Sequence, residues 1–427
     1  KAQSGYSDGS VWNKELKGDL SRSIKQTDRY RGMKEDGMSH EEILKEMTKP
    51  IKMKVFAWNK SHGIDTVMSP IDSVKYMKMF LQAGFLVMDP FTGDIKAWVG
   101  GIDHTFFQYD HVNIGAGRQV GSTIKPLLYT FAVTNGFSAC GTVPTTPQHF
   151  PGFQPTYYDA GGSKYGALPM AKALALSINN ATLYLINQVG INAFIDFAHR
   201  CGISSDLAKV PSAALGVSDV SLYEMLWAYT MFPTLGMNTK PIFITKIEDK
   251  NGNLIKSFVP QQKEIIDNKT AFTMVKMMRG VIDFGTGGRM RRLYGLTSEI
   301  AGKTGTTNGQ ADGWFIGYTP QLLAGAWVGC DDRLLRFRSE ALGQGAAAAL
   351  PIWAYFMKKV YSDKSLGIEQ GAKFTAPDGF KECEFYDPTS MERADMTQQG
   401  SRGMNNETPE SENEEAPYVV PNEDWGH

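Results

Sequence analysis

The sequence contains no run of about 18 or more apolar residues, the length that an α-helix needs to cross a bilayer. We therefore expect this chain to span no membrane. It also lacks an excess of charge of either sign, because 44 lysines and arginines are balanced by 45 aspartates and glutamates. A protein that binds nucleic acid needs a basic surface for the phosphates. The charge balance argues against nucleic acid as the main partner.

Cysteine and histidine are scarce as well. The four cysteines contain no Cys-x-x-Cys pair, so they neither require nor exclude a disulfide. The seven histidines show no spacing typical of metal ligands, and His104 and His111 fit a loop better than a metal site. The sequence therefore predicts no metal and no other cofactor. It begins at Lys1 with neither an initiator methionine nor a signal peptide, and we expect it to be part of a longer protein.

Composition divides the chain of 427 residues into three segments. Residues 1–48 are polar and are predicted to form a linker segment, with one helix over 19–34 and a second after the capping box at 39–42. Residues 49–375 carry the apolar patterns of a folded catalytic domain. Residues 376–427 are polar and acidic, and we expect this tail to be disordered because it cannot bury enough apolar surface.

The stretch Arg118-Gln-Val-Gly-Ser-Thr-Ile-Lys-Pro126 has the pattern of a helix start that carries an activated nucleophile. Pro126 fits the first turn of a helix, where backbone donors have no internal partner. Ser122 is then predicted at the first helical position and Lys125 one turn later on the same face. A neutral lysine within hydrogen-bond range could take the hydroxyl proton as the serine oxygen attacks a carbonyl. Burial or a second cation nearby would favour the neutral amine.

A Ser-x-x-Lys pair is a weak signal alone, since most such pairs on helices are solvated neighbours. Two further motifs follow it in order, Ser177-Ile-Asn179 and Lys303-Thr-Gly305. Taken alone, the first fits an Asn cap inside a helical hairpin equally well, and the second fits an ordinary edge strand. The ordered trio is the signature of penicillin-binding proteins and serine β-lactamases, in which the second motif reads Ser-Asp-Asn.

The remaining pattern predicts an α/β fold in which an antiparallel sheet packs against helices. Strands are predicted at 55–58, 85–88, 95–99, 300–307, 313–318 and 322–328, and a hairpin at 241–247 and 253–258. Helices are predicted at 69–81, 171–176, 181–189, 221–231, 270–282 and 351–360. Residues 140–166 are expected to form an irregular loop over the site. Gly302 and Gly305 are expected to leave room for a substrate backbone beside their strand.

Three stretches resemble the transpeptidase domain of class A penicillin-binding proteins, in the form found in the Bacteroides group. They read Arg-Gln-Val-Gly-Ser-Thr-Ile-Lys-Pro, Ala-Leu-Ser-Ile-Asn-Asn and Ala-Gly-Lys-Thr-Gly-Thr-Thr, and Asp-Gly-Trp-Phe-Ile-Gly-Tyr-Thr-Pro follows them. The resemblance covers roughly residues 50 to 360 and implies an antiparallel sheet sandwiched by helices, with an added helical lobe. In the family, a membrane anchor and a glycosyltransferase domain precede this region. Both are absent from this sequence, so residues 1–48 would join the two domains.

The resemblance implies a D,D-transpeptidase whose substrate is a peptidoglycan stem peptide ending in D-Ala-D-Ala. Ser122 would attack the penultimate D-Ala carbonyl with Lys125 as the base, and an amine of a neighbouring stem would resolve the acyl-enzyme. Ser177 would relay a proton to the leaving nitrogen, and Asn179 would hydrogen-bond the peptide. β-Lactam antibiotics would acylate the same serine and inhibit the enzyme.

The third motif would bind the substrate through Lys303, Thr304, Gly305 and Thr306. The lysine and the two threonine hydroxyls suit a terminal carboxylate, which needs a cation and donors together. The backbone N–H groups of Ser122 and Thr306 would form the oxyanion hole. As in the family, the domain would work at the periplasmic face of the inner membrane, beside its glycosyltransferase domain and held by an anchor outside this sequence.

Three alternative functions stay open. A class A β-lactamase needs a deacylating glutamate in a Glu-x-x-Leu-Asn setting, which Glu224-Met-Leu-Trp does not match. A carboxypeptidase would use water in place of the amine, and the sequence does not exclude water as a side acceptor. A β-lactam sensor that acylates without turnover is disfavoured, because the sequence has no receptor-like membrane segment.

Overall fold

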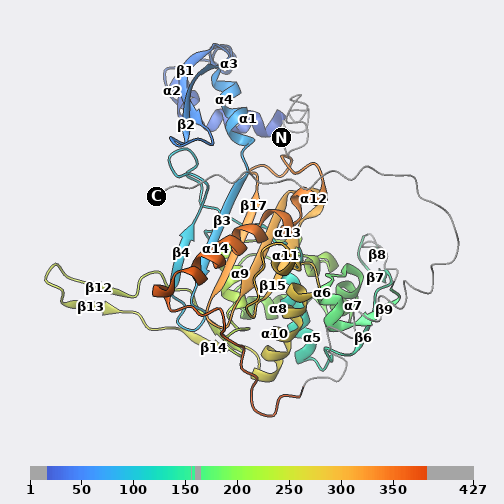
Figure 1. Cartoon of the computed structure of the whole chain (residues 1–427). Coiled ribbons are helices and arrows are strands. Elements are labelled where there is room, and N and C mark those ends of the chain that lie inside the picture. The colour runs from blue at the N-terminus through green and yellow to red at the C-terminus, as the bar shows by residue number, and fades with distance from the viewer. Residues whose placement is uncertain (1–16, 155, 159–164, 382–427) are drawn as a thin grey trace, which may run out of the picture. The chain divides into compact units, whose positions relative to one another are not determined.

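A five-stranded antiparallel sheet lies at the centre of the structure, a computed structural model that describes residues 17–154, 156–158 and 165–381. The strand order is β15-β16-β17-β3-β4 (Figure 1). The strands are β3 Gln82–Met88, β4 Ile95–Val99, β15 Ala301–Thr306, β16 Asp312–Tyr318 and β17 Leu323–Gly329. The last three form an antiparallel meander, as predicted, and β17 pairs with β3 from the N-terminal hairpin.

The two faces of this sheet pack against different helices. These are α5 Lys125–Thr134, α6 Met170–Ala175, α7 Asn179–Val189, α8 Ile191–Arg200, α9 Leu222–Tyr229, α10 Asn268–Asp283, α11 Arg289–Arg292 and α14 Leu350–Ser362. Leu86 and Met88 of β3 pack in one core with α5 to α10, whereas Phe85 and Val87 pack in another with α11 and α14. Successive side chains of a strand point to opposite faces, which produces this division. The predicted α/β arrangement, an antiparallel sheet between helices, is confirmed.

The N-terminal part of the described chain has a small core of its own, formed by Ile24, Tyr30, Ile43 and Met47. Its elements are α1 Lys17–Gln26, α2 Asp28–Glu35, α3 His40–Met47, α4 Pro70–Lys78 and the hairpin of β1 Ile51–Phe56 and β2 Gly63–Met68. The single helix predicted over 19–34 is wrong, because the Thr27 hydroxyl accepts a hydrogen bond from the Tyr30 N–H and starts a separate helix there.

Two predicted boundaries near the first hairpin are also wrong. The strand predicted at 55–58 lies at Ile51–Phe56, where Ile51 to Lys54 alternate between partly buried and exposed positions and Val55 and Phe56 are buried. The helix predicted over 69–81 begins at Pro70 after the Ser69 cap but ends at Lys78. Pairing of Gln82 to Met88 with β17 takes over beyond that point, and tertiary pairing outweighs the helical pattern.

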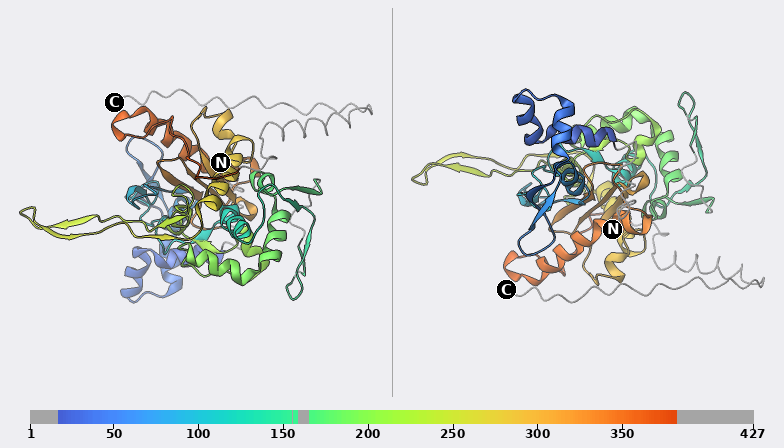
Figure 2. Two further views of the ribbon diagram at one scale, coloured as in Figure 1. Left: turned by 90° about the horizontal axis from the view of Figure 1, so that it is seen from below. Right: turned by 90° about the horizontal axis from the view of Figure 1, so that it is seen from above.

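The segment 140–166 differs from the predicted irregular loop. β6 Thr142–Pro144 pairs with β9 Ala167–Pro169, and β7 Gln148–His149 pairs with β8 Tyr157–Tyr158. Strands of two or three residues are too short to produce a recognisable alternation in the sequence. By contrast, the predicted hairpin around Asn251-Gly252 is present as β12 Lys246–Glu248 and β13 Leu254–Ser257. Figures 1 and 2 show that it extends away from the central sheet.

Within the described ranges, no helix combines the length and the hydrophobicity that a membrane crossing requires. In the same part of the chain, no three His, Cys, Asp or Glu side chains are grouped so that they could hold a metal ion. Cys140 is disulfide-bonded, whereas Cys201 and Cys330 are buried free thiols. Most of the tail predicted over 376–427 lies outside the described residues.

Glu224 is the centre of a buried hydrogen-bond network at the start of α9. The predicted capping box is present, because Ser221 and Glu224 each accept a hydrogen bond from the other's backbone N–H. The carboxylate also accepts from the backbone and hydroxyl groups of Ser204 and Ser205. Burial alone would raise the pKa of Glu224, but the hydrogen bonds outweigh it and lower the pKa below its ordinary value.

Glu224→Gln is expected to lower the free energy of unfolding by about 3 kcal/mol at neutral pH, because several buried donors lose a charged acceptor. The stability that an ionised carboxylate with a lowered pKa contributes is present at neutral pH and is lost as the pH falls through that pKa. The difference between parent and variant should therefore shrink in acid. Urea unfolding followed by tryptophan fluorescence at several pH values measures both effects.

Glu264→Gln is the matched control, because Glu264 lies exposed on β14 Gln262–Glu264. It should change the free energy of unfolding by less than about 0.5 kcal/mol. Equal effects of the two substitutions would contradict the structural role of Glu224.

Candidate active site

Ser122 lies in a tight turn just before α5. The chain forms the short strand β5 Arg118–Gln119 and the 3₁₀ turn η1 Gly121–Ile124, and α5 then begins at Lys125. The prediction that Ser122 is the first α-helical residue is therefore wrong, although Pro126 lies in the first helical turn as predicted. A 3₁₀ turn has about three residues per turn, so Ser122 and Lys125 still lie on the same side of the chain.

Close contacts between backbone segments fix this turn. Gly121 has a φ of +51°, and its N–H donates to the Gly216 carbonyl oxygen at 3.0 Å. A Cβ on Gly216 would lie 2.1 Å from the Gly121 oxygen, and a Cβ on Gly121 would lie 2.8 Å from the Thr306 oxygen. A larger residue at either position would force the backbone apart. The segment that carries Ser122 is therefore held directly against the end of β15.

A buried ion pair ties the same segment to the sheet. Arg118 Nε donates to Asp312 Oδ1 at 2.7 Å, and its other nitrogens donate to the carbonyl oxygens of Cys330 and Asp331. Trp327 Nε1 donates to the same Asp312 oxygen at 3.0 Å. Because both charged groups are hydrogen-bonded in fixed directions, the residues just before Ser122 have a defined position relative to β16 and β17.

Ser177 lies in the break between α6 and α7, where the sequence predicts a polar interruption. It has a φ of +57°, a conformation that costs a residue with a Cβ on the order of 1 kcal/mol. The second helix begins at Asn179 instead of the predicted Ala181. The break turns the side chains of Ser177 and Asn179 toward Lys125.

Lys125 is completely buried and donates hydrogen bonds to the second motif. Its Nζ lies 2.7 Å from the Ser177 carbonyl oxygen, 3.2 Å from Ser177 Oγ and 2.6 Å from Asn179 Oδ1. No hydrogen bond between Lys125 Nζ and Ser122 Oγ occurs among the described residues, although the sequence places the two groups within reach. The amine must turn from Ser177 to Ser122 before it could take the serine proton.

Lys303 reaches the same serine from β15. Its side chain is completely buried, and its Nζ donates to Ser177 Oγ and to the Thr304 carbonyl oxygen, both at 2.9 Å. The Ser177 oxygen thus accepts from two lysines. A hydroxyl has two acceptor lone pairs and one proton, so the Ser177 proton is left to be donated to a further group.

The two lysines have lowered pKa values. Burial lowers the pKa of Lys125 well below its ordinary range, and the nearby charge of Lys303 lowers it further. Burial also lowers the pKa of Lys303 to about 7. A buried pair of amines cannot easily carry two positive charges, so the site favours one ammonium and one neutral amine at neutral pH.

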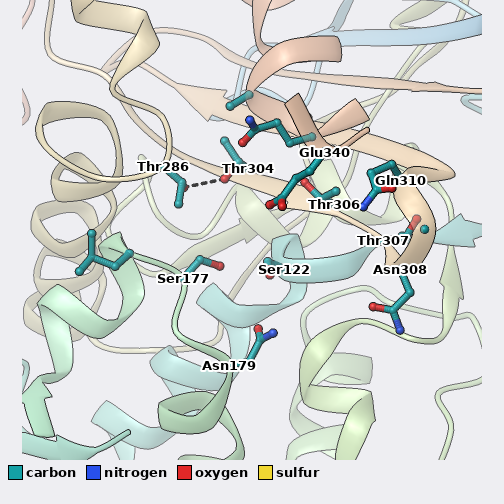
Figure 3. Close-up of a pocket in the computed structure, with 14 residues that line it drawn as sticks. Ser122, Ser177, Asn179, Thr286, Thr304, Thr306, Thr307, Asn308, Gln310 and Glu340 are labelled. Atoms are coloured by element: carbon teal, nitrogen blue, oxygen red, sulfur yellow. Dashed lines mark hydrogen bonds between the residues drawn. The ribbon is translucent and has the colours of Figure 1, made fainter. Parts of the chain in front are cut away.

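The threonines of the third motif line the cleft beside Ser122. Thr304 Oγ1 lies 2.6 Å from Thr286 Oγ1, and Thr306 Oγ1 accepts a hydrogen bond from the Gly345 N–H at 3.0 Å. The Thr306 hydroxyl proton is therefore free to be donated into the cleft. Figure 3 shows both threonines on the side of the pocket that faces Ser122.

The protein's own backbone occupies the space beside Gly302 and Gly305. A Cβ on Gly302 would lie 2.7 Å from the Ile316 oxygen, and a Cβ on Gly305 would lie 2.7 Å from the Val120 oxygen. The expectation that these glycines leave room for a substrate backbone is thus not supported on those faces. A direct contact between Gly305 and the substrate stays a prediction.

A pocket of about 390 Å³ joins all three motifs (Figure 3). Its lining includes the predicted residues Ser122, Ser177, Asn179, Thr304 and Thr306. It also includes residues that the sequence reasoning missed: Leu176, Thr286, Thr307, Asn308, Gly309, Gln310, Glu340, Gln344 and Ala346. Of these, Thr286 carries a local signal because it stands between Gly285 and two further glycines, and Asn308-Gly309 carries one because it is a turn dipeptide.

A second pocket of about 400 Å³ adjoins the first and shares Ser122 and Asn179 with it. Gly216 and Tyr158 also line this pocket. Tyr158 belongs to the segment 140–166, so at this residue the segment does lie over the site, as predicted. Ser122 therefore lines two adjoining pockets.

Comparison with protein-family models gives two matches. Residues 7–81 match the penicillin-binding protein middle domain, and residues 83–328 match the penicillin-binding protein transpeptidase domain. Penicillin-binding protein 1A of Aquifex aeolicus (strain VF5) is 35% identical over 289 residues, which are 66% of this chain and 38% of that protein. The chain therefore spans 38% of the length of this relative.

Solved structures are similar as well. Penicillin-binding protein 1A from Haemophilus influenzae superposes with a TM-score of 0.60 at 24% identity, over 70% of this chain and 49% of that one. The PonA1 protein from Mycobacterium tuberculosis in complex with penicillin V superposes with a TM-score of 0.58 at 20% identity, over 85% of this chain and 96% of that one. These likenesses confirm the predicted fold, an antiparallel sheet sandwiched by helices.

Proposed function

This chain belongs to the penicillin-binding protein transpeptidase family, and on that premise we propose that the Ser122 cleft is the centre of a serine D,D-transpeptidase. The observation that carries the proposal is the meeting of Lys125 and Lys303 at the Ser177 hydroxyl, beside Ser122. The donor substrate is a peptidoglycan stem peptide that ends in D-Ala-D-Ala. The product is a cross-link to a neighbouring stem.

In the acylation step, Ser122 Oγ attacks the carbonyl carbon of the penultimate D-Ala. Lys125 in its neutral form takes the serine proton, which the lowered pKa of its amine favours. The C–N bond to the last D-Ala breaks and Ser177 passes its proton to the leaving nitrogen, while Lys125 gives the proton that it took from Ser122 to Ser177 Oγ and is neutral again. The two hydrogen bonds that Ser177 accepts from lysines support this direction of proton donation.

In the second step, an amine of a neighbouring stem attacks the ester carbonyl, the ester C–O bond to Ser122 breaks, and the proton that the amine loses passes through Lys125 to Ser122 Oγ. The backbone N–H groups of Ser122 and Thr306 serve as the oxyanion hole in both steps, since the Ser122 turn packs against the end of β15. One such donor contributes about 3 kcal/mol to transition-state stabilisation. Asn179 holds Lys125 through its oxygen, which leaves its NH₂ group to donate to the peptide.

The carboxylate of the last D-Ala binds at the Thr304 and Thr306 hydroxyls. Lys303 supplies the positive charge behind them, since its ammonium lies against the Thr304 carbonyl. A β-lactam carries a similar carboxylate next to a reactive carbonyl, and it acylates the same serine. The penicillin V complex of the similar PonA1 protein supports this assignment.

The resemblance to class A penicillin-binding proteins implies two further parts beyond this sequence. In the longer protein, a glycosyltransferase domain supplies the glycan strands whose stems are cross-linked here, and an N-terminal anchor holds both at the periplasmic face of the inner membrane. The residues that match this chain make up 38% of the Aquifex aeolicus relative, so that protein has further segments outside the match. Glu224 supports a transpeptidase over a class A β-lactamase, because its carboxylate is engaged by Ser204, Ser205 and Ser221.

Benzylpenicillin is expected to form one long-lived adduct on Ser122, because the sequence has no match to the Glu-x-x-Leu-Asn setting of a class A β-lactamase and Glu224 is engaged by three serines. Intact mass should rise by one penicillin, and peptide mapping should locate it on Ser122. Transpeptidation is then measured as release of D-Ala from a donor peptide with and without an acceptor amine. Loss of the adduct within seconds would overturn the proposal in favour of a β-lactamase.

Lys125→Ala should lower the second-order acylation rate by a factor on the order of 10² to 10⁴, because the serine loses its proton acceptor. The rate is measured with a fluorescent penicillin, and circular dichroism checks the fold. Lys358→Ala, which removes an exposed lysine of α14, is the matched control and should leave the rate unchanged. Near-normal acylation by folded Lys125→Ala would show that another group is the base.

Lys303→Ala should slow acylation by a penicillin about 10- to 100-fold, since a buried charged hydrogen bond contributes about 1.5–3 kcal/mol. The methyl ester of the same penicillin should lose much less. With the parent, the ratio of acid to ester rates should fall as the pH rises through about 7, where Lys303 loses its proton. An equal loss for acid and ester would show that Lys303 acts on the reacting centre or the fold.

A further inference from the structure

The hairpin of β12 Lys246–Glu248 and β13 Leu254–Ser257 carries exposed apolar side chains. Ile247, Leu254 and Ile255 are 42%, 61% and 66% exposed. Within the described residues the two strands form a sheet of their own, and Figures 1 and 2 show that they extend away from the central sheet. An isolated two-stranded sheet is only marginally stable in water, so a further strand beside it would stabilise it.

The two outer edges of the hairpin differ in regularity. The register shifts between Ile247 and Glu248, which pair with Lys256 and Leu254, so Ile255 is an extra residue in β13. A β-bulge of this kind disturbs the edge of the strand that contains it and opposes pairing there. β12 has no extra residue. Its outer edge is therefore the one that suits a further strand.

The backbone groups of β12 alternate between the inside of the hairpin and its outer edge. The Thr245 carbonyl oxygen and the Asp249 N–H both bond to the opposite arm of the hairpin, at 2.9 and 3.0 Å. In an antiparallel ladder, every second residue directs both of its backbone groups to the same neighbour. The N–H and C=O groups of Lys246 and Glu248 therefore point outward. In the part of the chain that the structure describes, no strand pairs with them.

The side chains of Lys246 and Glu248 determine which strand fits this edge. Both are exposed, and they form an ion pair at 2.8 Å within β12. A lone lysine on an edge opposes pairing, but here a charge of each sign lies two residues apart. If a second β12 lies antiparallel with the two Ile247 residues opposite each other, Lys246 of each copy faces Glu248 of the other. Opposite charges directly across neighbouring strands stabilise the pairing, so β12 is complementary to itself.

The same arrangement satisfies the outward backbone groups. Each Lys246 and the facing Glu248 form a hydrogen-bonded pair that exchanges both N–H···O bonds. The two Ile247 residues then form the intervening pair without hydrogen bonds, whose Cα atoms lie about 4.5 Å apart. Because the hairpin extends away from the central sheet, as Figures 1 and 2 show, two copies can pair at β12 without a collision of their cores.

We propose that the outer edge of β12 binds a second copy of this chain, and that the two hairpins form one antiparallel sheet with a two-fold axis at Ile247. The contact is small, so the dimer is weak and its population depends on protein concentration. This interaction goes beyond the proposed function and does not depend on it, because no residue of β12 or β13 lines the pockets at Ser122.

Two opposite charge substitutions, Lys246→Glu and Glu248→Lys, test the pairing by sedimentation velocity at increasing protein concentration. Each variant alone places like charges across the two-fold axis, and its dissociation constant should rise about tenfold or more over that of the parent. In an equimolar mixture, the acidic β12 of one variant faces the basic β12 of the other. A heterodimer should therefore form at concentrations where neither variant associates alone. Loss of the ion pair within β12 cannot explain this result, since both chains of the mixture lack it.

The matched control is Lys263→Glu, which makes the same change of charge on the exposed strand β14. It should leave the dissociation constant of the parent unchanged, and mixing it with Glu248→Lys should give no heterodimer beyond what Glu248→Lys forms with the parent. Circular dichroism checks the fold of each variant.

A cysteine at the two-fold axis tests the register. The two thiols of an Ile247→Cys dimer would lie within disulfide distance, so oxidation should link the chains covalently. Leu254→Cys, exposed on β13, is the control and should cross-link roughly tenfold more slowly. Non-reducing electrophoresis follows both reactions, and the parent corrects for the cysteines that the chain already has.

Heterodimer formation together with faster cross-linking at Ile247→Cys is the expected result. A parent that stays monomeric, with no heterodimer in the mixture, would overturn the inference. So would a dimer that neither charge substitution weakens, because it would use another surface, or faster cross-linking through Leu254→Cys, which would assign the contact to β13. A failure of penicillin to acylate Ser122 would overturn the proposed function alone and would leave this interaction untouched.

Discussion

Two buried lysine side chains meet at one serine hydroxyl, and the rest of the site depends on this contact. Lys125 comes from α5 and Lys303 from β15, yet both donate to Ser177 Oγ. Each amine is removed from water, where a charge is costly, and each charge raises the cost of the other. The fold must hold both amines within hydrogen-bonding distance of one oxygen, at 3.2 Å for Lys125 and 2.9 Å for Lys303.

Backbone packing fixes the segments that carry these two lysines. The Ser122 turn is pressed between Gly216 and the end of β15, where the contacts leave no room for a Cβ. Arg118 then fixes the preceding residues through Asp312, on the neighbouring strand. β15 and the Ser122 turn are far apart in the sequence. Short-range contacts fix their relative position, and these contacts leave little room for a shift of either backbone.

The sequence was sufficient for the parts of the fold and site that have strong local patterns. The sheet strands, the capping box at Ser221 and the Asn251-Gly252 hairpin each follow a rule that acts over a few residues. The order of the three motifs identified the residues that the structure brings together around one pocket. Their catalytic roles stay predictions.

What the sequence could not supply depends on contacts between distant segments. The positive φ of Ser177, the 3₁₀ turn at Ser122 and the partners of Lys125 arise from packing that no local pattern records. Glu340 was missed for the same reason, since it lines a pocket whose other residues come from distant segments. The glycines at 302 and 305 were assigned to a substrate, whereas they accommodate the chain's own backbone.

The contact between Gly345 and Thr306 also determines how the cleft responds to ligands of different size. A Cβ on Gly345 would lie 2.3 Å from the oxygens of both Gly305 and Trp314, so this backbone already sits as close to the sheet as atoms allow. The backbone at Gly345, just after α12, therefore cannot move closer to β15 and β16. Adjustment must instead come from rotation of long side chains such as Glu340 and Gln344, which line that rim. The backbone sets the width of the cleft. Substitutions at Glu340 and Gln344 would change which ligands fit without moving that backbone.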